Sequence, residues 1–339
     1  MKSDENQCAL GWTDYLKFNI HSKCSCDRDL HGTLTIITGA NSGIGYEATK
    51  YLADKGSKVI MACRSVKRAT EARETMQKEN PKRVIQIEQL DVSSLASVRS
   101  FAKRIRAKVD KIDLLINNAG VLMNPGLSED GFEIHFATNY LGHFLLTNLL
   151  LDTLKKSPDA RIINVSSSFH LIGRYNLDKV KQISTSALLS YANSKLYNVM
   201  FTNELKKRLQ GTTVTAYSLN PGAVATNITY GLNDNTFQRN ILPPIYSVAK
   251  RTILKTPLQG IQTILHIALN KNIKQYSGDY FSECGVSITN PIVKISRKRK
   301  ELWRESEQYA GLSTINNLFL VWAHSFHTFN VLQTPTTLS

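Results

Sequence analysis

The sequence has no long apolar run. Among its 339 residues, no stretch reaches the roughly 20 consecutive apolar residues that a membrane-spanning helix needs. Residues 1–29 contain no apolar core of signal-peptide length, so we expect no secretion. The nearest apolar run, 318–332, is interrupted by two histidines, a serine and an asparagine. These absences predict an intracellular protein, either cytoplasmic or attached to a membrane surface such as that of the endoplasmic reticulum.

Cysteine is scarce and scattered. The five cysteines are Cys8, Cys24, Cys26, Cys63 and Cys284. An odd number at wide spacing argues against a disulfide framework and fits a reducing compartment. Cys24 and Cys26 could form half of a metal site, but Cys63 ends a predicted strand and no CxxC or HxxxH pattern completes four ligands. We therefore expect no metal.

Acidic residues are outnumbered: 42 Lys and Arg against 27 Asp and Glu give a net charge of +15. Such a surplus attracts nucleic acid, acidic lipids and phosphorylated cofactors alike. The densest basic cluster, 297–300, has no interleaved aromatic residues for base stacking, so we expect no nucleic-acid partner. Together with the apolar run in a C-terminal extension, 313–339, it suggests peripheral membrane contact, and plain solvated charge is the alternative.

From residue 32 onward, short β-branched runs alternate with longer helical patterns. Strands are predicted at 35–37, 59–62, 84–90, 114–116, 161–165, 214–219 and 280–281. Helices are predicted at 44–55, 67–78, 94–108, within 131–156, at 187–209 and at 257–269. Alternating order and continuously apolar strands predict an α/β fold with a single doubly wound (Rossmann) parallel sheet and helices on both faces. We assign this domain to 32–312, after an N-terminal extension at 1–31. Its ligand crevice should lie beyond the carboxyl ends of the strands.

A glycine-containing turn joins the first predicted strand to the first predicted helix. Gly39 permits the tight exit from the strand, Gly43 lets backbone N–H groups approach a pyrophosphate, and Gly45 lets the helix pack closely on the sheet. The helix N-terminus then offers free N–H groups and a favourable dipole to the anion. We therefore assign cofactor binding in this turn to Gly39, Asn41, Ser42, Gly43, Ile44 and Gly45.

The ends of the next two strands bear on cofactor choice. An NAD-preferring site would carry Asp or Glu at the end of the second strand, where this chain has Cys63 followed by Arg64. A guanidinium offers a 2′-phosphate a bidentate partner, although a solvated charge is the alternative. Asp91 could bind the adenine amino group and Val92 could cover the ring, but an Asp here could equally cap a helix. The pattern predicts NADP(H).

Tyr191 and Lys195 stand four residues apart in a predicted helix, hence on one face. An ammonium beside a phenol stabilises the phenolate and lowers its pKa from about 10 toward neutrality. A serine among 166–168, after a strand, would bind the substrate oxygen as charge develops. Asn139 falls inside a predicted helix, where binding water or turning a carbonyl toward a site would explain it. The Tyr–Lys spacing alone also occurs by chance.

Five motifs occur in a characteristic order and spacing: TGANSGIG (38–45), NNAG (117–120), the strand-end serines, the Tyr–Lys pair and NPG (220–222). In these motifs the chain resembles the short-chain dehydrogenase/reductase family, from about residue 29 to residue 312. The resemblance implies a catalytic tetrad of Asn139, Ser167, Tyr191 and Lys195. In the family, the lysine also holds the nicotinamide ribose and the asparagine anchors a water. Cofactor contacts are implied for Asn118, Ala119, Gly120, Tyr191, Lys195, Pro221, Gly222, Val224 and Thr226.

Within the family, MACR (61–64), NYLGHFLLT (139–147) and GDYFSEC (278–284) resemble the retinol dehydrogenase branch. That implies an NADP(H)-dependent oxidoreductase interconverting a lipophilic alcohol and its aldehyde or ketone, in the manner of retinol and retinal. The branch often carries an N-terminal membrane anchor, which 1–31 do not show. The alternatives are an NADPH-binding regulatory protein without turnover and a reductase of steroid or other small carbonyls. A homodimer is a further hypothesis.

Overall fold

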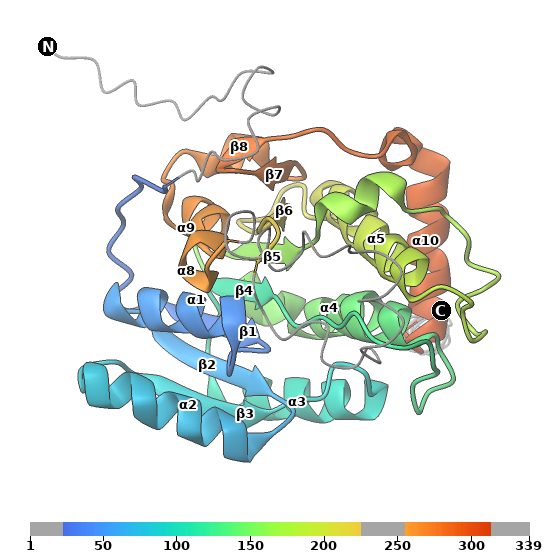
Figure 1. Ribbon diagram of the computed structural model, residues 1–339. Coiled ribbons are helices and arrows are strands. Elements are labelled where there is room, and N and C mark those ends of the chain that lie inside the picture. Colours follow the sequence, from blue (N-terminus) through green and yellow to red (C-terminus); the bar gives the residue numbers. More distant parts are fainter. Residues whose placement is uncertain (1–22, 225–254, 313–339) are drawn as a thin grey trace, which may run out of the picture.

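A single sheet organises the part of the chain that the computed structural model describes, residues 23–224 and 255–312 (Figure 1). Three parts of the sequence-based prediction lie outside the described residues: Thr226, the C-terminal extension with its apolar run, and most of the N-terminal extension.

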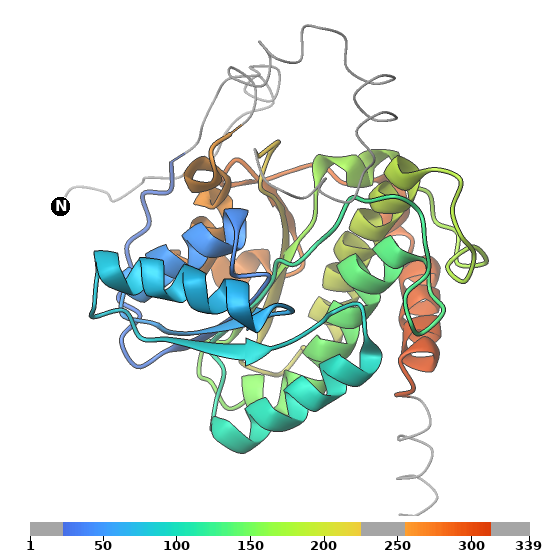
Figure 2. The same cartoon turned by 60° about the horizontal axis from the view of Figure 1, so that its bottom comes forward.

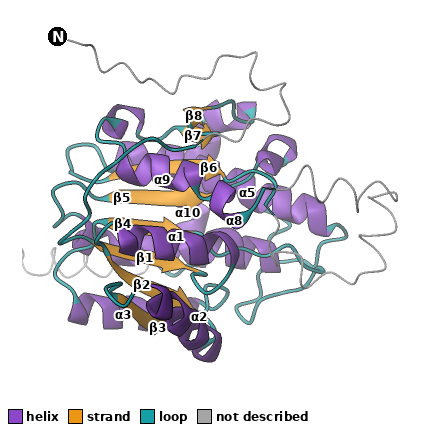
Figure 3. Ribbon diagram, turned by 60° about the vertical axis from the view of Figure 1, so that its left-hand side comes forward, coloured by secondary structure: helices purple, strands orange, loops and turns teal. Residues whose placement is uncertain are grey.

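The sheet has eight strands in the order β3-β2-β1-β4-β5-β6-β7-β8 (Figure 3). Their bounds are β1 Leu34–Thr38, β2 Lys58–Cys63, β3 Ile85–Gln89, β4 Leu114–Asn117, β5 Arg161–Val165, β6 Thr215–Asn220, β7 Tyr280–Ser282 and β8 Gly285–Val286. All neighbours pair in parallel except β7 and β8. The order reverses between β1 and β4, which places the switch point there.

Strand burial follows position in the sheet. Every residue of β1, β4 and β5 is buried, whereas in β3, at the edge, only Ile85 is buried and the other residues are partly or fully exposed. Helices on both faces of a sheet bury its central strands completely. The β-branched and apolar residues of these strands are the sequence signal that predicts such burial. The predicted fold class is confirmed.

Two helical layers enclose the sheet, each over its own apolar core (Figure 2). One layer holds α1 Gly43–Asp54, α2 Val66–Glu79, α8 Pro257–Gly260 and α9 Gln262–Leu269. The other holds α3 Leu95–Lys108, α4 Gly142–Leu154, α5 Ala187–Arg208 and α10 Ser296–Tyr309. Tyr191 and Lys195 therefore approach the sheet from one face, and the turn before α1 approaches it from the other.

Two predicted helices differ from their expected form. The helix expected at 257–269 is divided at Ile261 into α8 and α9. The long helix expected within 131–156 is a π-helical segment, Phe136–Leu141, followed by α4. A π-turn holds one extra residue per hydrogen-bonded loop and shifts the side chains that follow. The spacing of apolar residues in the sequence does not reveal this irregularity.

Helix α10 docks on α5 through aromatic and buried polar contacts. Trp303 packs 5.7 Å from Phe201 of α5 between ring centroids, and the Arg208 guanidinium of α5 lies 4.0 Å from the centre of the Trp303 ring. The basic cluster at 297–300 opens this helix, and its third member, Arg299, is buried with its Nε 3.7 Å from Glu204 Oε2. That arginine is part of the packing, so the cluster does not form one continuous solvated patch.

Candidate active site

The glycine turn leads directly from β1 into α1. Gly43 has φ of +55°, a conformation that favours glycine, and a Cβ at Gly45 would stand 2.7 Å from Asn118 Nδ2. Ser42 precedes the helix, and its side chain makes no capping bond to the first turn. The turn thus provides close backbone approach and a helix N-terminus, the arrangement that a dinucleotide pyrophosphate requires.

Thr38 holds the turn against the end of β4. Its hydroxyl accepts hydrogen bonds from the backbone N–H groups of Asn118 and Ala119, both at 2.9 Å. Asn118 Nδ2 returns a bond to Thr38 O at 2.9 Å. These bonds couple β1 and β4 at the switch point, so the glycine turn and the segment 118–120 are positioned together. The buried His143 lies with its Nε2 2.9 Å from the same hydroxyl.

Arg64 lies beyond the end of β2, with its side chain 70% exposed and its Nε 3.8 Å from Asp91 Oδ2. Asp91 accepts hydrogen bonds from the backbone N–H and hydroxyl of Ser93, while Ser94 caps α3. Asp91 is therefore not the helix cap, which was the alternative reading. Burial raises the pKa of the Cys63 thiol to about 11, so this residue adds no charge beside the ribose position.

The structure brings Ser167, Tyr191 and Lys195 together. The Ser167 side chain faces the Tyr191 phenol closely enough to lower its pKa, and Lys195 Nζ lies 5.5 Å from the centre of the Tyr191 ring. Lys195 Nζ also donates to Val165 O at 2.9 Å, which ties the lysine to the carboxyl end of β5. Of the three strand-end serines, Ser166 is buried and donates to Lys195 O at 2.7 Å, whereas Ser168 is exposed. Ser167 is the one that faces the phenol.

Burial governs the protonation of this pair. It raises the pKa of Tyr191 to about 12, with the Ser167 hydrogen bond opposing the shift, and it lowers the pKa of Lys195 to about 8. We expected Lys195 to bring the phenol pKa toward neutrality. The protein groups around Tyr191 raise that pKa instead. The reason is that both side chains are withdrawn from water and the ammonium bonds to a carbonyl rather than to the phenol oxygen.

Asn139 lies within the π-helical segment and is almost fully buried. Its Oδ1 accepts from Val121 N at 2.8 Å and its Nδ2 donates to Ser194 Oγ at 2.9 Å. Its backbone carbonyl accepts from Asn198 Nδ2 at 3.0 Å. The side chain therefore braces the segment that follows Gly120 against α5, a role that the sequence analysis did not predict for it.

The segment after β6 forms the remaining wall. Asn220 Oδ1 accepts from Gly222 N at 3.1 Å, and Val224 forms a bridge with Lys255. Lys255 is nearly buried, packs against Gly222 and forms an ion pair with Glu283. Sequence reasoning missed this pair, because its members are separated by 28 residues and Lys255 belongs to none of the recognised motifs.

A cavity of about 260 Å³ lies elsewhere, lined among others by Glu133, Asn193 and Tyr197. None of Ser167, Tyr191 or Lys195 lines it. We place the chemistry at the carboxyl ends of the strands, where the glycine turn and Tyr191 meet, because a doubly wound sheet binds its ligand there.

Comparison with known proteins identifies the family of this fold. Residues 33–236 match the family described as short chain dehydrogenase. Retinol dehydrogenase 12 of Mus musculus is 39% identical over 298 residues, covering 87% of this chain and 92% of the relative. Retinol dehydrogenase 11 of Homo sapiens is 39% identical over 291 residues, covering 85% and 89%.

A solved structure, that of an uncharacterized protein from Mycobacterium Paratuberculosis, is 31% identical, with a TM-score of 0.66 and coverage of 83% of this chain and 94% of that one. No helix within the described residues is long and apolar enough to cross a membrane. The chain is an oxidoreductase that belongs to the short-chain dehydrogenase family and, within it, to the retinol dehydrogenase branch.

Proposed function

We propose that the protein is an NADP(H)-dependent oxidoreductase that interconverts a lipophilic alcohol and its aldehyde or ketone, with a retinoid as the expected type of substrate. The observation that carries the proposal is the meeting of the Tyr191 phenol, the Ser167 side chain and the Lys195 ammonium, whose Nζ lies 5.5 Å from the centre of the phenol ring. A protein that only binds a nucleotide has no use for this arrangement.

In the reductive direction, Tyr191 gives its proton to the carbonyl oxygen. Its pKa of about 12 keeps the phenol protonated at neutral pH, as a proton donor requires. Ser167 binds the same oxygen as negative charge develops on it. Lys195 supplies positive charge beneath the phenolate that forms, and Asn139 holds the backbone after Gly120 in register with α5. The nicotinamide, when bound, gives or takes the hydride.

The residues that would hold this cofactor fit it. The turn between β1 and α1 offers close backbone approach and a helix N-terminus to the pyrophosphate. Arg64 is largely exposed at the position where a 2′-phosphate would lie, and its ion pair with Asp91 is long enough to be exchanged for a phosphate. This exposed guanidinium supports NADP(H) over NAD(H).

Two observations support a lipophilic substrate. The relatives that align over most of the chain are retinol dehydrogenases. In addition, Phe169 lies beside the phenol with ring centroids 6.0 Å apart and is 40% exposed, so an apolar surface adjoins Tyr191. An aldehyde or ketone with a large apolar body would bury such a surface on binding.

Substitution of Tyr191 provides the test. The rate of retinaldehyde reduction can be monitored as the decrease in NADPH absorbance. For Tyr191→Phe this rate should be at least about 100-fold lower than for the wild type, because the proton donor is gone. NADPH affinity, measured by fluorescence titration, should change little. The matched control is Tyr217→Phe, which removes a buried hydroxyl bonded to Ile273 O and should retain activity.

Two outcomes would overturn the proposal. NADPH binding by the wild-type chain without turnover of retinaldehyde, short aldehydes or sterol ketones would favour the regulatory alternative. Near-normal activity of Tyr191→Phe would remove the tyrosine from the mechanism.

A further inference from the structure

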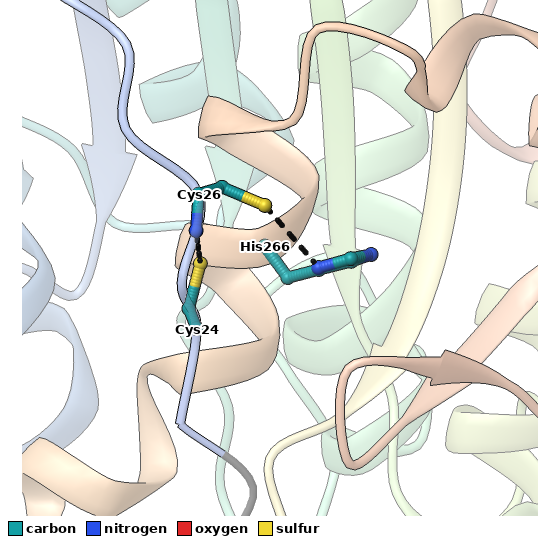
Figure 4. A group of neighbouring side chains, drawn as sticks. All are labelled: Cys24, Cys26 and His266. Atoms are coloured by element: carbon teal, nitrogen blue, oxygen red, sulfur yellow. Dashed lines mark hydrogen bonds between the residues drawn. The ribbon is translucent and has the colours of Figure 1, made fainter. Parts of the chain in front are cut away.

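Two thiols and an imidazole meet on the face of the sheet opposite to Tyr191. Cys24 and Cys26 belong to the segment that precedes β1, and His266 belongs to α9 (Figure 4). Their ligand atoms, both Sγ atoms and one ring nitrogen, all lie within 4.8 Å of one another. We propose that these three side chains bind a thiophilic metal ion, Zn²⁺ in the first place, with an exchangeable fourth ligand. This departs from the sequence-based expectation of no metal.

The distances agree with those of a zinc centre. Zinc–sulfur bonds of about 2.3 Å and zinc–nitrogen bonds of about 2.0–2.1 Å at tetrahedral angles place sulfur and nitrogen roughly 3.6 Å apart. Cys26 Sγ and His266 Nδ1 are 3.6 Å apart. Cys24 Sγ accepts a hydrogen bond from Cys26 N at 3.4 Å, a contact that stabilises a thiolate.

Local structure directs both thiols inward. From Lys23 to Leu30, exposed residues alternate with half-buried or buried ones, so Cys24 and Cys26 share the inner side. The facing helix presents Gln262 and His266 one turn apart, and Gln262 Oε1 accepts from Cys24 N at 2.9 Å. The segment is therefore held along α9 in the register that brings the thiols to the imidazole.

A separate network fixes the two elements relative to each other. Asp159 Oδ2 accepts from Arg28 at 2.8 Å and from Arg161 at 2.7 Å. The buried Arg161 also donates to Ile267 O at 2.7 Å and to Asn270 O at 2.8 Å, capping the end of α9. One carboxylate thus ties the N-terminal segment to the helix that carries His266.

The second ring nitrogen of His266, Nε2, also has a polar neighbour. His266 Nε2 lies 3.5 Å from Asn270 Nδ2, and rotation of this amide would offer its oxygen to the Nε2–H once Nδ1 binds metal. Binding releases the two thiol protons to solvent, and no change of oxidation state is involved. The ion would close a loop between residues 240 positions apart in the chain, so we infer that its role is to stabilise the fold.

The test is metal titration of the full-length chain, reduced and stripped with a chelator. Zn²⁺ should bind at one ion per chain in competition with a chromophoric chelator, and saturation should raise Tm by about 5 °C. Co²⁺ in its place should give a thiolate charge-transfer band. Cys24→Ser, Cys26→Ser and His266→Gln should each weaken Zn²⁺ affinity by more than about 100-fold, since even outer-sphere partners cost about 10- to 100-fold.

Cys63→Ser is the matched control, because it removes a buried thiol outside the cluster and should bind Zn²⁺ as the wild type does. Cys24→Ser is nearly isosteric and half-buried, so circular dichroism should show it folded. The proposal fails if the wild-type chain binds no stoichiometric Zn²⁺, the result expected for a thiol–imidazole hydrogen bond alone. It also fails if Cys63→Ser loses as much affinity as Cys24→Ser.

Discussion

Lys195 shows how one residue can cost stability and still be required by the proposed chemistry. It is 2% exposed, and burial lowers its pKa from 10.5 to about 8. Between these two values the unfolded chain binds more protons at this site than the folded chain does. The free energy of unfolding should therefore rise with pH across that window, and the charged lysine destabilises the fold at neutral pH.

Lys195→Met should accordingly stabilise the fold near neutral pH while abolishing turnover. At about 1.4 kcal/mol per pKa unit, less about 1 kcal/mol for the hydrogen bond to Val165 O, the gain is roughly 2 kcal/mol at pH 7. Urea unfolding at about pH 7 and about pH 9.5 measures it, and the gain should vanish at the higher pH. Lys207→Met, exposed on the same helix, serves as control. A gain that is independent of pH would contradict the argument.

At the scale of elements, α10 is held on α5 by a buried ion pair. Arg299 and Glu204 are each 4% exposed, and the Arg299 guanidinium also donates to Val293 O. Removal of Glu204 leaves the Arg299 charge buried and uncompensated, which costs more than the pair itself contributes, whereas Glu204 keeps Arg208 as a second partner at 3.5 Å.

Glu204→Ala should therefore lower the free energy of unfolding by about 3–5 kcal/mol. Addition of Arg299→Leu should restore part of this loss, since the double variant no longer buries an unpaired charge. Chemical denaturation of the two single variants and the double variant forms the cycle that checks it. Arg304→Ala, 73% exposed on the same helix, should change stability by less than about 1 kcal/mol. Additive losses in the cycle would show that the two residues act separately.

The elements also show what the sequence could and could not predict. The central strands and the helices between them were predicted because their apolar runs and the glycine turn are local signals. The division of α8 from α9 and the π-helical segment around Asn139 were not, since both are set by packing against distant residues. The same limit applies to the candidate sites. Tyr191 and Lys195 lie within one helical turn, whereas Cys26 and His266 are 240 residues apart.

At the scale of the whole molecule, the residues for proton transfer and the candidate metal site lie on opposite faces of the sheet. The face covered by α5 and α10 supplies Tyr191 and Lys195, and the face covered by α1 and α9 supplies the glycine turn and the Cys24–Cys26–His266 cluster. Both candidate sites can therefore be altered independently, and metal loss should lower Tm without removing the proton donor. The net charge of +15 belongs to this scale as well, because its field reaches any anion that approaches the molecule.

That charge predicts a salt dependence that distinguishes the two cofactors. NADPH carries a 2′-phosphate that NADH lacks, so screening should weaken NADPH binding more steeply as salt rises past about 0.1 M, where the Debye length is about 10 Å. If Arg64 holds that phosphate, Arg64→Gln should make the two salt dependences nearly parallel. Arg304→Gln removes the same charge from an exposed position on α10 and should leave the difference intact. Fluorescence titrations over a series of salt concentrations measure the binding of both cofactors to the wild type and to the two variants. Equal effects of the two substitutions would mean that the general field, and not Arg64, recognises the phosphate.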